Sequence, residues 1–151
     1  MIQSVPLPPD SSALPESIRL LQLVWRLNVA LQRTSLDMEQ RLGVTGTQRF
    51  LLRYVGLVPG ATRDALANVL SEDASVLQAD LDRLVAGNLL VSQPGSAGYY
   101  LTSDGVSVNA AMTGTVEEAI SKACDEATTY ERWSFRQMIE RVVSHLAPRQ
   151  T

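Results

Sequence analysis

The chain has 151 residues, 45% of them hydrophobic, and a formal net charge of -3 at pH 7. This length and apolar content predict one globular domain with a proper core, which argues against a disordered or a membrane protein. The mildly negative charge neither requires nor excludes nucleic-acid binding, because a basic patch can lie on an acidic body.

The first predicted elements are an arm and a long helix. Three prolines among residues 1–14 favour an extended N-terminal arm, because proline fixes φ and lacks the N–H that a helix needs. Residues 15–42 carry apolar side chains at helical spacing on two stripes, so this helix needs burial on two sides. Arg19, Arg26 and Arg33, seven residues apart, mark its polar stripe and argue against a membrane span.

Three shorter helices are predicted next. The first covers residues 46–57, after which Pro59 and Gly60 break the pattern. Two more follow, with Thr62 as the N-cap of one and Asp73 as the N-cap of the other. Both carry apolar residues at helical spacing, so they are expected to share one small core.

A β-hairpin is predicted after these helices. Residues 87–88, a Gly-Asn pair, tolerate the positive φ at which the last helix stops. Residues 89–91 and 99–101 suit two strands, and Pro94-Gly95 has the residue types of a type II turn between them. Two helices followed by such a hairpin are the order of a winged helix-turn-helix.

The C-terminal part is predicted to be helical. Residues 105–127 carry apolar and small side chains along one side, and Thr128-x-x-Glu131 resembles a capping box that opens a last helix. Apolar helices therefore stand at both ends of the chain, and a small winged core cannot cover them. We expect the same surface of a second copy to do so, which gives a two-fold homodimer.

The order of these motifs resembles the MarR family of transcription regulators. The resemblance rests on residues 61–91 and on Leu101-Thr102-Ser103-Asp104-Gly105, the L-T-x-x-G pattern that ends the wing in that family. It implies a mainly α fold with a small β-hairpin wing. The single domain would cover residues 15–151, with the winged helix-turn-helix at about 45–101 and dimerisation helices at about 15–42 and 105–148.

The resemblance also implies a dimeric regulator that binds double-stranded DNA. The helix that begins near Asp73 would lie in the major groove, and Gln78 is the best base reader because its amide pairs bidentately with adenine. Thr62 and Arg63 would contact backbone phosphate. The predicted DNA-binding residues are Thr62, Arg63, Ser75, Val76, Gln78, Ala79, Asp82 and Arg83.

Family members also bind small aromatic acids between the dimerising helices and the winged unit. Trp25, Arg49, Arg53 and Tyr54 could supply an aromatic wall and a carboxylate partner for such an effector. The alternative for Arg49 and Arg53, which are four residues apart, is a solvated helix face.

The chain departs from the family in its charges. The wing tip, residues 92–98, is short and uncharged, and Gln78-Ala79 stands where the family often has a Ser-Arg pair. No Lys or Arg occurs between Arg83 and Lys122. Phosphate attraction supplies most non-specific DNA affinity, so we expect weak binding. The alternative is a degenerate winged-helix dimer that serves as a protein-interaction module.

Catalytic and cofactor motifs are absent from the sequence, so we predict neither an enzyme nor a cofactor or metal site. His145 is interpreted as a surface residue near a helix C-terminus, and Asp80-x-Asp82 as a solvated polar surface. Cys124, the single cysteine, excludes a disulfide framework and is interpreted as a small hydrophobe in a helical interface, with a redox sensor as the alternative. The start lacks a signal-peptide pattern, so a cytoplasmic location is expected.

Overall fold

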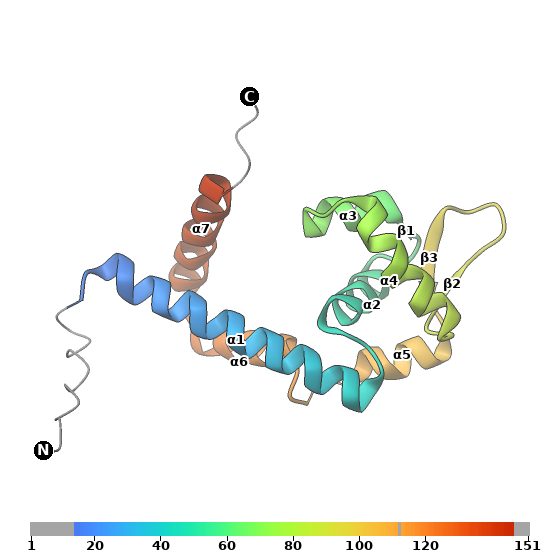
Figure 1. Cartoon of the computed structure of the whole chain (residues 1–151), viewed down its shortest axis with the longest axis horizontal. Coiled ribbons are helices and arrows are strands. Elements are labelled where there is room, and N and C mark those ends of the chain that lie inside the picture. Colours follow the sequence, from blue (N-terminus) through green and yellow to red (C-terminus); the bar gives the residue numbers. More distant parts are fainter. Residues whose placement is uncertain (1–13, 112, 147–151) are drawn as a thin grey trace, which may run out of the picture. The chain divides into compact units, whose positions relative to one another are not determined.

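A computed structural model of the chain describes residues 14–111 and 113–146, which form seven helices and three strands (Figure 1). Two compact units are distinguished, Met1–Ala110 and Ala111–Thr151, and each is described by itself. The predicted arm at residues 1–14 falls, except for Leu14, outside the described residues. The first unit contains α1 (Glu16–Leu42), α2 (Gly46–Leu57), β1 (Ala61–Thr62), α3 (Arg63–Leu70), α4 (Ala74–Ala86), β2 (Leu90–Ser92), β3 (Gly98–Leu101) and α5 (Ser103–Ala110).

Helix α1 has the predicted bounds and is exposed over most of its length. Pro15 precedes it, and Gly43 ends it with a φ of 71°, a left-handed conformation that favours glycine. Within the helix only Met38 is buried. Its C-terminal part is joined to α2 by the Gly46 N–H, which donates to the Ser35 hydroxyl at 2.8 Å. No helix in the described ranges is long and apolar enough to cross a membrane.

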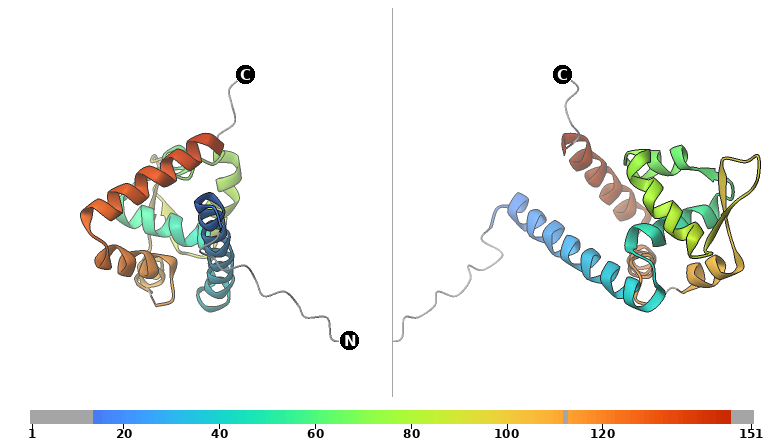
Figure 2. Two further views of the ribbon diagram at one scale, coloured as in Figure 1. Left: turned by 90° about the vertical axis from the view of Figure 1, so that its left-hand side faces the viewer. Right: turned by 45° about the vertical axis from the view of Figure 1, so that its right-hand side comes forward.

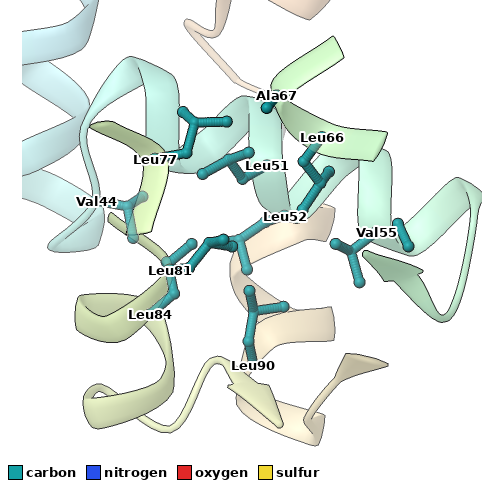
Figure 3. Close-up of a cluster of buried hydrophobic side chains, with 11 residues drawn as sticks. Val44, Leu51, Leu52, Val55, Leu66, Ala67, Leu77, Leu81, Leu84 and Leu90 are labelled. Carbon is teal, nitrogen blue, oxygen red and sulfur yellow. The ribbon is translucent and has the colours of Figure 1, made fainter. Parts of the chain in front are cut away.

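The core of this unit lies between α2, α3 and α4, where leucine side chains from different elements point toward one another (Figure 3). The fully buried members include Leu51 and Leu52 of α2, Leu66 of α3 and Leu81 of α4. Apolar side chains three or four residues apart form one face of each helix, which explains why three short helices share this core. Side chains packed in this way hold α4 by its inner face and leave its outer face to solvent.

Two helix starts in this core agree with the sequence prediction. The Thr62 hydroxyl accepts from the Ala65 N–H at 3.2 Å, and the Asp73 carboxylate accepts from the Ser75 N–H at 2.8 Å. Each bond satisfies one of the N–H groups that a helix N-terminus leaves without a partner. At the end of α4, Asn88 takes the positive φ of 56°, whereas Gly87 has a φ of -78°.

The wing is part of a three-stranded antiparallel sheet with the order β1-β3-β2. The hairpin of β2 and β3 was predicted, but β1 was not, because two residues are too few to leave a sequence pattern. Ala61 of β1 pairs with Tyr99, and Val91 of β2 pairs with Tyr100. The Ser96 N–H donates to the Gln93 carbonyl at 3.0 Å across the predicted Pro-Gly turn.

The L-T-x-x-G pattern joins the wing to α5. The Thr102 hydroxyl donates to the Asn88 carbonyl at 2.5 Å and accepts from the Gly105 N–H at 3.0 Å. The Thr102 N–H donates to the Leu89 carbonyl at 3.2 Å. Gly105 lies so close to Leu89, the residue before β2, that an added Cβ would stand 2.0 Å from the Leu89 oxygen. The pattern therefore closes the end of the hairpin against α5.

The helix predicted over residues 105–127 is wrong as a single element. Helix α5 ends at Ala110, and α6 (Val116–Glu126) begins only after a left-handed Gly114 with a φ of 73°. Arg49 of α2 provides a physical reason for the end of α5, because its guanidinium donates to the Val108 carbonyl and to the Asn109 carbonyl, the latter at 2.9 Å. The last carbonyls of a helix have no partner within it, so the arginine caps this C-terminus.

The second unit consists of α6 and α7 (Thr129–Leu146). The predicted capping box is confirmed, since the Thr128 hydroxyl accepts from the Glu131 N–H at 3.2 Å and the Glu131 carboxylate accepts from the Thr128 N–H at 2.7 Å. The Thr128 bonds hold the pKa of Glu131 below its usual range. Arg132 donates to the Cys124 and Ala127 carbonyls, so an arginine also caps α6.

Candidate nucleic-acid interface

Helix α4 presents the candidate DNA-facing surface on the side away from the core. Leu77, Leu81 and Leu84 are buried, whereas the positions on the opposite side of the helix are exposed or half-buried. Four of these outward positions recur at i, i+3, i+4 and i+7 and so share one face. They are Ser75, Gln78, Ala79 and Asp82. Figure 2 shows α3, α4 and the wing hairpin of this unit from a second direction.

The remaining predicted DNA-contacting residues are also accessible. Val76 is 59% exposed, and the side chain of Arg83 is 73% exposed. Thr62 and Arg63 lie at the N-terminus of α3, where Thr62 is already the N-cap. The structure thus places the predicted residues on the surface of two consecutive helices, α3 and α4.

A chain of hydrogen bonds connects α3 to the outer face of α4. The Arg63 Nη1 donates to the Gln78 Oε1 at 3.3 Å, and the Gln78 Nε2 donates to the Asp82 Oδ1 at 2.8 Å. Arg63 also pairs through Nε with the Asp64 carboxylate at 3.4 Å. Gln78 and Asp82 are one helical turn apart, but Arg63 is 15 residues away from Gln78, so the sequence alone did not reveal this connection.

Asp73 is fixed at the start of α4. Its carboxylate accepts from the Ser75 hydroxyl at 2.7 Å as well as from the Ser75 N–H. The bonds to the Ser75 hydroxyl and then to its N–H lower the pKa of Asp73. Asp73 is therefore an ionised cap at neutral pH, and the Ser75 hydroxyl already has one acceptor before any DNA arrives.

The prediction of a solvated Asp80 is wrong. The side chain of Asp80 is only 23% exposed, and its Oδ1 accepts from the Gln48 Nε2 at 2.8 Å. Gln48 is buried in α2 and forms a capping box with Thr45. Asp80 thus links α4 to the start of α2. The Arg83 Nη1 lies 4.0 Å from the same Asp80 Oδ1. Asp82 remains on the outer face, as expected.

The wing carries hydroxyls and amides in place of charges. The Ser96 hydroxyl accepts from the Gly98 N–H at 3.2 Å, and the Ser92 hydroxyl donates to the Ser96 carbonyl at 3.3 Å. Gly98 pairs with Thr62 of β1, and an added Cβ at Gly98 would stand 2.3 Å from the oxygen of Gly60, the residue before β1. This tip is a closely turned loop of uncharged residues, and it adds no basic group to the surface formed by α3 and α4.

The four residues predicted for an effector pocket are not brought together in one cavity of the described structure. Trp25 is 68% exposed and lines an apolar groove along α1 to which none of the other three belongs. Arg49 is 1% exposed, so a solvated face is wrong for this residue, and its guanidinium binds the carbonyls at the end of α5. Arg53 and Tyr54 are half-buried, and Tyr54 stacks on Phe50 with ring centroids 6.4 Å apart.

Metal-ligating residues do not gather within residues 14–111 and 113–146, where no group of three or more His, Cys, Asp or Glu side chains could hold an ion. Cys124 is partly exposed on α6, and His145 is exposed in the last turn of α7.

No family model and no curated protein matches this sequence. Solved structures do match. A Staphylococcus aureus MepR–DNA complex has a TM-score of 0.66 and 18% identity, covering 90% of this chain and 99% of MepR. The DNA complex of the Mycobacterium tuberculosis MarR family protein Rv2887 has a TM-score of 0.58 and 20% identity, and the match covers 85% of this chain and 98% of Rv2887. The structure of Rv2887 with p-aminosalicylic acid has a TM-score of 0.56 and 20% identity, and the match covers 85% of this chain and 98% of Rv2887.

Proposed function

Because the chain has the winged helix-turn-helix fold of the MarR family regulators, we propose that it is a dimeric, DNA-binding transcription regulator. The observation that carries this proposal is the outer face of α4, which is held by its buried leucines and presents Gln78 and Ala79 to solvent next to Arg63 of α3. In this geometry α4 would enter the major groove, and Arg63 would meet the phosphate backbone. The proposal gains support from two structural neighbours that are complexes with DNA.

The charge of this surface limits the strength of the interaction. Residues 61–102 contain only two basic side chains, Arg63 and Arg83, and both face carboxylates, Asp64 and Asp80. A dimer would thus offer four arginines to phosphates. Each neutralised phosphate contributes about -0.9 to the slope of log K against log salt, so we expect a slope no steeper than about -4.

Ala79→Arg should strengthen DNA binding and steepen its salt dependence. Ala79 is exposed on the outer face of α4, so an arginine there adds one phosphate contact per protomer and about -1.8 to the slope of the dimer. The measurement is a titration against DNA from upstream of the protein's own coding sequence at several salt concentrations. Ser121→Arg, which adds the same charge on α6, is the control and should change the slope little.

Two outcomes of this titration would be contrary to expectation, the first for the assigned DNA-facing surface and the second for the proposed function. A wild-type slope much steeper than about -4 would mean that other arginines face the DNA. No DNA binding by the wild type or by Ala79→Arg would favour the second candidate, a protein-interaction module. Two observations favour the protein-interaction module, the uncharged wing and the exposed carboxylates of Asp64, Glu72 and Asp82.

The dimer is proposed from apolar side chains that the described chain leaves exposed. On α1 they include Ile18, Leu20, Leu21, Leu23, Val24, Trp25, Leu27 and Leu31. On α7 they include Trp133, Phe135, Met138, Ile139, Val142, Val143 and Leu146. Such continuous apolar faces are typical of surfaces that a partner covers, and a second copy of the same chain is the simplest partner.

Val142→Glu or Leu20→Glu should therefore dissociate the dimer or unfold it, because an unpaired charge buried in an apolar interface costs several kcal/mol, roughly. Sedimentation velocity at micromolar concentration would detect the change. Ser144→Glu places the same charge at an exposed polar position of α7 and should leave the dimer intact. A folded wild-type monomer at this concentration would contradict the dimer.

An aromatic acid as effector is proposed with Arg53 as its carboxylate partner and the neighbouring Tyr54 as its aromatic wall. Support comes from the p-aminosalicylic acid complex of Rv2887 and from the half-buried position of Arg53. Millimolar salicylate should then raise the melting temperature, because a ligand stabilises the state that it binds. Arg53→Ala should abolish this shift, whereas Arg33→Ala on α1 should retain it. An unchanged melting temperature of the wild type would contradict the effector.

A further inference from the structure

We infer that Asp82 determines base specificity by orienting the Gln78 amide and by rejecting base edges that offer only acceptors. The inference rests on the proposed DNA-binding function and assigns a role to a carboxylate that weakens phosphate attraction. Its basis is the hydrogen-bonded chain Arg63–Gln78–Asp82, which links the start of α3 to the second turn of the exposed α4 face.

The two neighbours of Gln78 fix the orientation of its amide. Arg63 can only donate and the Asp82 carboxylate can only accept, so the Gln78 oxygen must face the guanidinium and its nitrogen the carboxylate. A flipped amide would set N–H groups against the guanidinium and oxygen against the carboxylate. After both bonds are made, one N–H and one oxygen lone pair of Gln78 remain, and together they match the N7 and N6 groups of adenine.

Asp82 adds a requirement of its own at the neighbouring base. Its carboxylate has lone pairs left after the bond to Gln78, and these accept from an amino group, which cytosine offers at N4 and adenine at N6. Guanine presents O6 and N7, and thymine presents O4, so either would place acceptors against a carboxylate. An acidic side chain on this face thus selects the strand orientation of the base pair that it meets.

The test is a selection from duplexes with a randomised central segment, performed with the full-length protein. Affinities are then measured for the enriched duplex and for its single-pair variants. The wild type should prefer an amino-bearing base at one position per half-site by about tenfold or more. Asp82→Asn removes the charge and can donate as well as accept, so this preference should fall to about twofold while affinity for all duplexes rises.

Glu72→Gln is the matched control. It removes one exposed carboxylate just ahead of α4, outside the Arg63–Gln78–Asp82 chain, and should raise affinity for every duplex without changing the preference. If Asp82→Asn and Glu72→Gln raise the affinity alike and both keep the base preference, Asp82 acts only through its charge and the inference is overturned. If the wild type selects sequences but Asp82→Asn retains the full preference, the inference again fails while DNA binding stands. A wild type that enriches no duplex overturns the proposed function and the inference together.

Discussion

Arg49→Met should lower the free energy of unfolding by about 3 kcal/mol, because it removes hydrogen bonds from a charged donor and leaves two helix-end carbonyls without their partner. Arg49 is 1% exposed, and its guanidinium donates to the carbonyls of Val108 and Asn109. Methionine keeps most of the volume and none of the donors, so the loss reports the interactions of the guanidinium and not a cavity. Urea denaturation monitored by far-ultraviolet circular dichroism would measure it.

Arg53→Met is the matched control for this experiment. Arg53 lies one turn further along α2 and is half-buried, so removing its charge should cost under about 1 kcal/mol. The difference between the two variants reports the interactions of the buried guanidinium, its bonds to the end of α5 included. Equal losses for both would mean that the bonds of Arg49 to α5 add nothing beyond the packing of its side chain.

Local motifs explain why much of the fold could be predicted from the sequence. Thr62 and Asp73 cap helices through bonds to residues two or three positions ahead, and Thr128 with Glu131 forms a capping box over the same distance. Gly43 ends α1 directly after the predicted last residue, Leu42, with a φ of 71°. Interactions of this range leave residue types at fixed spacing, which a single sequence displays.

The interactions that were missed join residues far apart in the chain. Gln48 binds Asp80 across 32 positions, and Arg49 reaches Asn109 across 60. Arg49 and Arg53 are four residues apart, which is also the spacing of two charges on a solvated helix face. No local signal therefore distinguishes the buried guanidinium of Arg49. For the candidate interface, the outward positions of α4 followed from helical periodicity, whereas the bond from Arg63 to Gln78 depends on how α3 packs against α4.

Gly105→Ala should destabilise the winged unit by about 3 kcal/mol or more, since the added methyl group must be accommodated against backbone. The Cβ would stand 2.0 Å from the Leu89 carbonyl oxygen and 3.3 Å from a methyl group of Leu101. The Leu89 oxygen cannot move freely, because it accepts from the Thr102 N–H at 3.2 Å. To relieve the clash, α5 would have to shift away from the hairpin.

The sign of this result is diagnostic because Gly105 lies in the first turn of α5, where alanine is favoured over glycine by about 1 kcal/mol in an unconstrained helix. Only the close approach to Leu89 can turn that gain into a loss. Gly87→Ala is the control: its φ is -78°, its position is exposed, and its Cβ would be 3.2 Å from the Arg83 oxygen, a distance that a small adjustment relieves. Thermal unfolding of both variants should show a large decrease in melting temperature for Gly105→Ala and a small change for Gly87→Ala. A Gly105→Ala variant as stable as the wild type would show that α5 does not pack against the hairpin at this distance, and that the glycine of the L-T-x-x-G pattern has another cause.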